Sequence, residues 1–476
     1  MKKEDLFEIL QDIDEQKITE ARNYRINRRS VWIKWSAVAA CLVVLFGALF
    51  VVFFSKSNNL EPEGYAHVGD SSVEPTYPSA IAVNLSAQDY MCSEERNNWL
   101  ESCKNTIEIA SELQSNMDEY YRAIIEKFLN TKDENVVCSP LNIYIATAVL
   151  AEVSGGNTRQ QILDMLSVHD IETLRSNIKT LWESNYSDTP ILKSLLGNSI
   201  WLKDGIAYNT ETMSRLAEQY YASSFSGTPG TEEMDEALRQ WTDKNTGGLL
   251  KEYTQKIKLD RDTVCAIMST LYYKASWDVD FSSQKTVKET FHGAMGDTVV
   301  DMMHTNDTLD IFKTGQYSAL RLALKDSGYM YVYLPREGVS LNDILSDEDV
   351  LNSTRDGNWL KKKVSLSLPK FRVSKKTDLK DVLKSFGVTD AFNAELSDFT
   401  PLTTQYDRLF LSKAEHAAMV EIDENGVVGA AYTEYVIEIE SSFVADEEFI
   451  VDRPFLFFVT AKDGSILFAG TVNNIE

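Results

Sequence analysis

Hydrophobic residues at helical spacing mark the start of a globular region near residue 111. Six apolar positions between residues 111 and 130 recur every three or four residues: Leu113, Met117, Tyr120, Tyr121, Ile124 and Phe128. This spacing predicts a helix with one buried face. The next stretch, NVVCSPLNIYIATAVLAEVS over residues 135–154, predicts a short apolar strand followed by a buried helix. Ser139-Pro140 marks the start of that helix, and Gly155-Gly156 marks its end.

A second pattern, alternation with a period of two, runs through residues 427–440. One face of the predicted strand is uncharged: Val427, Gly429, Ala431, Thr433, Tyr435, Ile437 and Ile439. The other face carries all three carboxylates, Glu434, Glu438 and Glu440. Residues 420–442 contain no proline, and the strand begins with small residues. Alternation alone favours an ordinary amphipathic edge strand, so the surrounding sequence must decide whether this segment is a loop that joins a sheet.

A third pattern is an uninterrupted apolar run over residues 36–54, SAVAACLVVLFGALFVVFF. As a helix it would span about 28 Å, close to the hydrocarbon thickness of a bilayer. Four arginines and Lys34 lie just before it without an acidic residue among them, which places the N-terminus in the cytoplasm. We predict a retained anchor rather than a cleaved signal peptide, because the run is long and no small-x-small site follows it.

These patterns divide the chain into four parts. We predict a cytoplasmic segment over residues 1–35, a transmembrane helix over residues 36–54, an extracytoplasmic linker over residues 55–110 and a globular domain over residues 111–476. The linker begins with a stretch rich in Ser, Asn, Glu, Gly and Pro. The protein is therefore expected in the cell membrane as a single-pass protein, with the globular domain outside the cell.

Composition narrows the function classes. The formal net charge of -25 and the pI near 4.7 argue against a nucleic-acid partner, because phosphate binding needs a basic surface. Of the five cysteines, Cys41 lies in the apolar run, Cys138 and Cys265 are expected in the core, and Cys92 and Cys103 are close enough in sequence to pair. Without a CxxC motif or a histidine cluster, we predict no metal and no cofactor. The chain also lacks GxSxG, HExxH, Walker and GxGxxG motifs, which argues against an enzyme.

Longer motifs follow one another in a fixed order through the globular region. They begin at residues 135–162 (NVVCSPLNIYIATAVLAEVSGGNTRQQI) and continue with NSIWLKDG from Asn198, WTDKNTGGLLKEY from Trp241, YYKASWDVDF from Tyr272, FHGAMGDTVVDMMH from Phe291, VSLSLPKFRVSKKTDLKDVLKSFGVTDAF from Val364, LSKAEHAAMVEIDENG from Leu411 and RPFLFFVTAKDGSILFAGTV from Arg453. In this order they resemble the serpins, a family of serine protease inhibitors. The resemblance covers residues 111–476, and it is to a bacterial-type member of the family, here with an N-terminal membrane anchor.

The resemblance implies an α+β fold of about nine helices and three β-sheets with an exposed reactive-centre loop. A target serine protease cuts this loop between the positions called P1 and P1′ and is held as an acyl-enzyme. The loop then inserts into the largest sheet as a new strand. The expected partner is therefore a serine protease in a covalent complex, and the inhibitor itself is expected to be a monomer.

The resemblance also assigns the hinge from which the loop would insert. Its residues are Glu424, Asn425, Gly426, Val427, Val428, Gly429, Ala430 and Ala431. In the family, the alternate side chains from Val427 onward become buried, and here they are uncharged, as insertion requires. Two positions depart from the usual pattern, because inhibitory serpins commonly carry Thr or Ser at the position of Val427 and a small residue at that of Tyr432.

A second set of residues matches the family positions that control opening of the main sheet. Ser139 and His416 match members of a hydrogen-bonded cluster, whereas Asn142 replaces a serine and Ser269 replaces an asparagine. Trp277 matches the tryptophan near the point where insertion begins. We predict an altered cluster at the centre of the sheet.

The family's register places P1 at Glu440 and P1′ at Ser441. The loop is a few residues longer than usual before Pro454, so Phe443, Val444 and Ala445 remain alternatives. Glu at P1 would suit a protease with a basic specificity pocket, Phe a chymotrypsin-like protease, and Val or Ala an elastase-like one. The predicted function is suicide inhibition of serine proteases, and the alternative is a non-inhibitory serpin that acts as a binding module.

Overall fold

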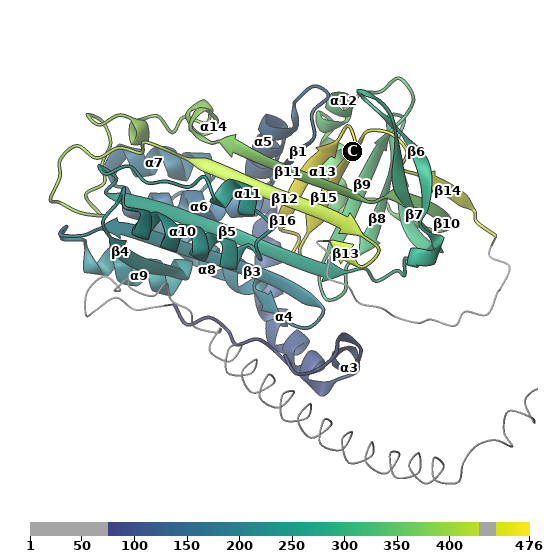
Figure 1. The fold of residues 1–476 in the computed structure, drawn as a ribbon, viewed down its shortest axis with the longest axis horizontal. Helices are drawn as coiled ribbons and strands as arrows, with labels where there is room; N and C mark the ends of the chain where they lie inside the picture. Colours follow the sequence, from purple (N-terminus) through teal and green to yellow (C-terminus); the bar gives the residue numbers. More distant parts are fainter. Residues whose placement is uncertain (1–74, 428–443) are drawn as a thin grey trace, which may run out of the picture. The chain divides into compact units, whose positions relative to one another are not determined.

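A computed structural model of the chain describes residues 75–427 and 444–476 (Figure 1). The chain divides into two units, and these residues all belong to the unit Tyr65–Glu476. The predicted cytoplasmic segment, the predicted anchor at residues 36–54 and the predicted bond Glu440–Ser441 lie outside the described residues. Within the described ranges, no helix combines the length and the hydropathy needed to cross a bilayer.

The hinge enters a seven-stranded sheet in the order β11-β12-β13-β5-β3-β2, with β4 beside β3. The strands are β2 (Ser187–Asp188), β3 (Leu192–Lys203), β4 (Ala222–Gly227), β5 (Cys265–Ser276), β11 (Phe371–Asp378), β12 (Glu415–Asp423) and β13 (Gly426–Val427). All neighbours are antiparallel except β3 and β4, which run parallel. A new strand that followed β13 between β5 and β12 would lengthen the contact between these two strands.

A nine-stranded sheet has the order β1-β16-β15-β9-β8-β7-β10-β14, with β6 beside β7. Its strands are β1 (Val136–Cys138), β6 (Val287–Gly293), β7 (Gly296–Lys313), β8 (Tyr317–Ala323), β9 (Tyr329–Pro335), β10 (Leu360–Pro369), β14 (Glu447–Ile450), β15 (Phe455–Thr460) and β16 (Ile466–Val472). The long strand β7 pairs with β6 and β10 and, at its C-terminal end, with β8. Because β7 continues through both groups of strands, the described residues form two sheets where the resemblance implied three.

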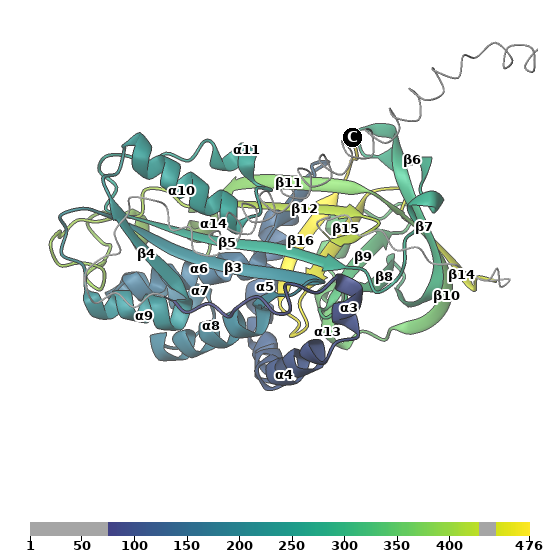
Figure 2. The ribbon, with the colours of Figure 1, turned by 60° about the horizontal axis from the view of Figure 1, so that its bottom comes forward.

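Twelve α-helices occur among the described residues, where about nine were expected. They are α3 (Ala87–Met91), α4 (Glu94–Gln114), α5 (Asp118–Leu129), α6 (Pro140–Val153), α7 (Gly156–Met165), α8 (Ile171–Asn185), α9 (Thr210–Tyr220), α10 (Glu232–Asn245), α11 (Lys251–Thr254), α12 (Leu341–Leu345), α13 (Glu348–Asp356) and α14 (Lys380–Ser385). Figure 2 shows α10 and α11 over one face of β3 and β5, and α6, α8 and α9 over the other. A loop that joins this sheet would therefore run between two helical layers.

Helix α6 forms where the sequence predicts it. Ser139 is its N-cap and accepts a hydrogen bond from the Asn142 backbone N–H, and Pro140 occupies the first turn, where a missing N–H costs nothing. Nearly every residue of α6 is buried, as expected for a helix that is apolar on all sides. The helix contacts both β5 and β16, so it lies between the two sheets.

The chain before residue 117 differs from the predicted linker. Ser86 and Ser93 cap α3 and α4 with side-chain hydrogen bonds, and α4 packs against α8. The helix predicted over residues 111–130 is consequently two helices, α4 and α5, joined by the 3₁₀ turn Ser115–Met117. The inward face of α4 carries only scattered apolar residues, including Trp99 and Ile107, among many polar ones. The helix therefore depends on packing against the domain rather than on a strong periodic pattern.

Candidate functional site

The first strand residues of the hinge already lie inside the seven-stranded sheet. Gly426 and Val427 form β13, which pairs with Ile422 and Asp423 of β12 on one side and with Ala275 and Ser276 of β5 on the other. The Val427 side chain is 0 % exposed. Within the parts of the chain that the structure describes, β5 and β12 are joined in the sheet only through β13 (Figure 1). Gly426 and Val427 of the predicted hinge are thus held as a short strand between β5 and β12.

Gly426 fits this position because it has no side chain. Its φ is +148°, and a Cβ atom built on it would lie 1.9 Å from the carbonyl oxygen of Ala275. Both the backbone conformation and the close approach to β5 therefore require glycine.

Trp277 directly follows β5 and lies beside the start of β13. Its indole Nε1 donates a hydrogen bond to the Asp423 carbonyl oxygen at 2.8 Å, and its backbone N–H donates to the Asn425 carbonyl oxygen. The ring is buried and packs edge-on against Phe281. Trp277 therefore links the end of β5 to the turn before Gly426.

Glu424 anchors the start of the hinge through two side chains that the sequence analysis did not identify. Its Oε2 lies 2.9 Å from Lys370 Nζ, and its Oε1 accepts a hydrogen bond from Thr286 Oγ1 at 2.8 Å. Burial raises the pKa of Glu424, but hydrogen bonds from Lys370, the backbone and Thr286 outweigh it and hold the pKa below its usual value. The same contact with Glu424 raises the pKa of Lys370. This ion pair ties the hinge to the residue between β10 and β11.

The sheet-opening residues predicted from the resemblance come together beneath the centre of the sheet. The Ser139 backbone N–H donates to His416 Nε2 of β12 at 3.0 Å, and Asn142 Nδ2 donates to Ser269 Oγ of β5 at 2.8 Å. The N-terminus of α6 therefore bonds to both strands that flank the hinge. The exchange of Ser and Asn keeps a hydrogen bond between α6 and β5, with the amide on the helix and the hydroxyl on the strand.

We expect His416 to make the native state sensitive to acid. Burial lowers the pKa of His416 from 6.5 to about 4, so between these values the unfolded chain binds a proton that the native protein does not. The free energy of unfolding should therefore fall as the pH drops from 6.5 towards 4, by up to about 3 kcal/mol from this residue. Urea unfolding followed by circular dichroism across this range measures the slope.

His416→Gln is the matched variant for this measurement, because an amide oxygen can still accept from Ser139 but does not titrate. The variant should show a shallower dependence on pH than the parent protein. Equal slopes in the two proteins would mean that His416 does not control the acid sensitivity.

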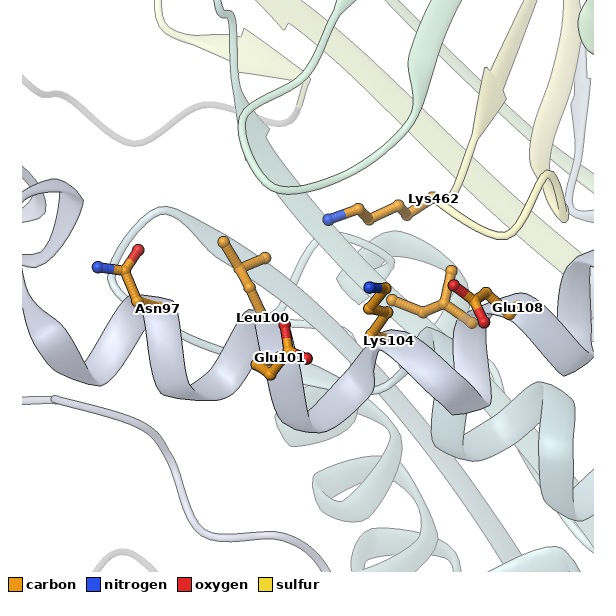
Figure 3. Close-up of a pocket in the computed structure, with 7 residues that line it drawn as sticks. Asn97, Leu100, Glu101, Lys104, Glu108 and Lys462 are labelled. Carbon is orange, nitrogen blue, oxygen red and sulfur yellow. The ribbon is translucent and has the colours of Figure 1, made fainter.

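A separate groove of about 610 Å³ runs along α4. Figure 3 shows Asn97, Leu100, Glu101, Lys104 and Glu108 on the helix, with Lys462 opposite them. Its lining includes neither the hinge nor the sheet-opening residues, and it mixes acidic, basic and apolar side chains. The described residues contain no group of three or more His, Cys, Asp or Glu placed to hold a metal ion.

Comparison with known proteins identifies the family. The family model described as serpin (serine protease inhibitor) matches residues 117–475, which is most of the chain. The chain is a serpin. It is 28 % identical to serpin B11 of Mus musculus over 365 residues, covering 72 % of this serpin and 93 % of that protein. It is also 28 % identical to human neuroserpin over 399 residues, covering 78 % and 92 %.

Solved structures agree with the fold. The thermophilic serpin tengpin in its native state superimposes with a TM-score of 0.67 at 20 % identity, covering 86 % of this serpin and 100 % of tengpin. Human thyroxine-binding globulin superimposes with a TM-score of 0.67 at 22 % identity, covering 78 % and 99 %. The predicted α+β serpin fold is therefore confirmed, whereas the bacterial-type assignment stays a prediction. Hinge residues Val428, Gly429, Ala430 and Ala431 lie outside the described residues.

Proposed function

We propose that this serpin inhibits serine proteases by the suicide mechanism of its family. The observation that carries the proposal is β13, because Gly426 and Val427 already pair with both β5 and β12. Insertion of further loop residues after Val427 would extend an existing ladder of hydrogen bonds rather than start a new one. The following residues alternate so that the small or uncharged side chains of Gly429, Ala431 and Thr433 fall on the same face as the buried Val427.

The chemistry then follows from strand addition. The serine hydroxyl of the protease attacks the P1 carbonyl carbon, the peptide bond breaks, and the new amino group leaves with the P1′ residue. The P1 residue stays bound to the protease as an ester. Successive residues of the freed loop that enter between β5 and β12 would form backbone hydrogen bonds alternately to one strand and to the other, as in any antiparallel ladder. The advancing loop draws the acylated protease away from the site of cleavage before water hydrolyses the ester.

We assign P1 to Glu440 and P1′ to Ser441, and Phe443, Val444 and Ala445 mark the alternative bonds. Val444, the first described residue after the loop, is 72 % exposed. The Asp446 N–H donates to the Lys363 carbonyl oxygen at 2.7 Å, and β14 begins at Glu447. Glu440 would favour a protease with a basic pocket, since a carboxylate needs a positive partner once it is desolvated.

A second candidate is a non-inhibitory serpin that serves as a binding module. It is favoured by Val427, which stands where inhibitory serpins commonly have Thr or Ser.

For either function we propose that residues 36–54 hold the domain outside the cell. Protease protection of intact cells tests this location, because an extracellular domain should be digested from outside while residues 1–35 stay protected.

The test of inhibition is the formation of a covalent complex. The full chain is incubated with glutamate-specific, chymotrypsin-like and elastase-like serine proteases and is resolved on denaturing gels. With one class of protease we expect a band at the summed mass of the protease and residues 1–440, together with a released C-terminal peptide whose sequence begins at Ser441. If every protease cuts the loop without a complex or a gain in heat stability, the binding-module function replaces inhibition.

A further inference from the structure

A partly buried ion pair joins the segment before the family match to a turn beside the hinge. Arg96 lies on α4, outside the matched residues 117–475. Its guanidinium makes a bidentate contact with Asp326: Nε donates to Oδ2 at 2.9 Å, and Nη2 donates to Oδ1 at 2.6 Å. The Asp326 side chain is only 2 % exposed. A bidentate contact of this kind fixes orientation as well as distance.

Asp326 belongs to the β8–β9 turn, which holds the end of β5. The Lys325 N–H donates to the Ser276 carbonyl oxygen at 2.9 Å, and Leu324 forms a bridge with Trp277. Ser276 in turn pairs with Gly426 of β13. A short path therefore runs from Arg96 through the turn to the last residue of β5 and to the hinge.

The segment that carries Arg96 is attached to the domain at other points as well. Tyr77 Oη donates to the Tyr221 carbonyl oxygen at 2.9 Å, and the Ile81 N–H donates to the Asp188 carbonyl oxygen at 2.8 Å. At the far end of α4, Gln114 Nε2 donates to Ser465 Oγ at 3.0 Å. Because these contacts do not involve Arg96, its loss should free the β8–β9 turn from α4 without releasing the segment.

We propose that Arg96 is a positioning residue for the hinge, because by fixing the β8–β9 turn it restrains β5 from moving away from β12 before a protease cuts the loop. The proposal rests on the suicide mechanism above, in which the sheet gains stability as the loop enters. Two hinge residues are already inserted, so the uncut loop would enter further if the end of β5 were free to shift. Arg96 slows that premature insertion, which would use up the inhibitor.

The test measures conversion of the uncut protein, so it does not depend on finding the target protease. The full chain and its Arg96→Met variant are incubated at 37 °C, and the fraction that has become resistant to heat denaturation with an intact loop is followed over time. We expect Arg96→Met and Asp326→Asn each to convert several-fold faster than the parent protein. Asn suits position 326 because the residue has a φ of +57°, which Asn tolerates.

Two further variants separate positioning from general stabilisation. Lys104→Met removes one positive charge from the same helix at an exposed position and should convert at the parent rate. Arg96→Lys keeps the positive charge but cannot make the bidentate contact, and it should convert at an intermediate rate. The proposal is overturned if Arg96→Met converts no faster than Lys104→Met, or if it only unfolds at a lower temperature without forming the heat-resistant species. Absence of any protease complex in the parent protein would instead refute the proposed inhibition.

Discussion

Val427→Arg is expected to turn the protein from an inhibitor into a substrate. Val427 is the first hinge side chain to be buried, and β5 and β12 enclose it on both sides. A guanidinium in this position would have no acidic partner between the strands, and burying an unpaired charge costs several kcal/mol. Insertion would slow while ester hydrolysis continued, so the yield of covalent complex should fall by at least about tenfold. Gel quantification of complex and cleaved inhibitor measures this ratio.

Glu438→Arg is the matched control, since it introduces the same side chain into the same loop on the opposite face of the alternation. It should leave insertion intact and keep the yield of complex near that of the parent protein. Val427→Thr, which restores the residue common in inhibitory serpins, should also retain inhibition. Retained complex formation in Val427→Arg would show that the hinge register is wrong.

Glu152→Ala is expected to reduce the free energy of unfolding by about 3–5 kcal/mol, because it removes one partner of a buried charge network. Glu152 of α6 is 0 % exposed, and its Oε1 contacts Arg175 Nη2 at 2.8 Å and Arg215 Nε at 2.9 Å. Its Oε2 accepts a hydrogen bond from Tyr220 Oη at 3.0 Å. The substitution would leave two guanidinium groups close together without their shared counter-ion. Urea unfolding of the uncut protein at neutral pH measures the loss.

The control for this prediction, Glu172→Ala, removes a different carboxylate that pairs with Arg175. Glu172 pairs with Arg175 but is 76 % exposed, so water screens the contact. Glu172→Ala should therefore change the free energy of unfolding by less than about 1 kcal/mol. If the two variants lose similar amounts, the buried network does not stabilise the packing of α6 against α8 and α9.

The sequence predicted well those elements whose start and end are set by residues within or next to the element itself. Helix α6 is capped by Ser139, started by Pro140 and ended before Gly155, and each of these residues acts within one turn of its own position. Residues 87–110 were included in the predicted linker, but they form α3 and most of α4. The position of α4 is fixed by contacts such as Arg96 with Asp326, which are 230 residues apart. No pattern within the segment reports those contacts.

The same distinction applies to the site. Resemblance placed Ser139, Asn142, Ser269 and His416 in one cluster, and the structure shows the hydrogen bonds by which α6 holds both β5 and β12. The ion pair that anchors the hinge was not predicted. Glu424 was recognised as the start of the hinge, but nothing in the sequence pairs it with Lys370, which lies in the connection between β10 and β11. An acidic residue on its own does not indicate which of many lysines neutralises it.

The sequence by itself determined the family motifs and the one-sided charge pattern of residues 427–440, and it predicted the residues of the hinge, because these depend on the order and alternation of side chains along one segment. Only the tertiary structure decided that β13 is already paired within the sheet and that α4 contacts the turn beside it. Both features depend on segments that are distant in the chain and adjacent in space. Their free energies arise from packing, burial and hydrogen bonds between those segments, which the pattern of any single segment does not record.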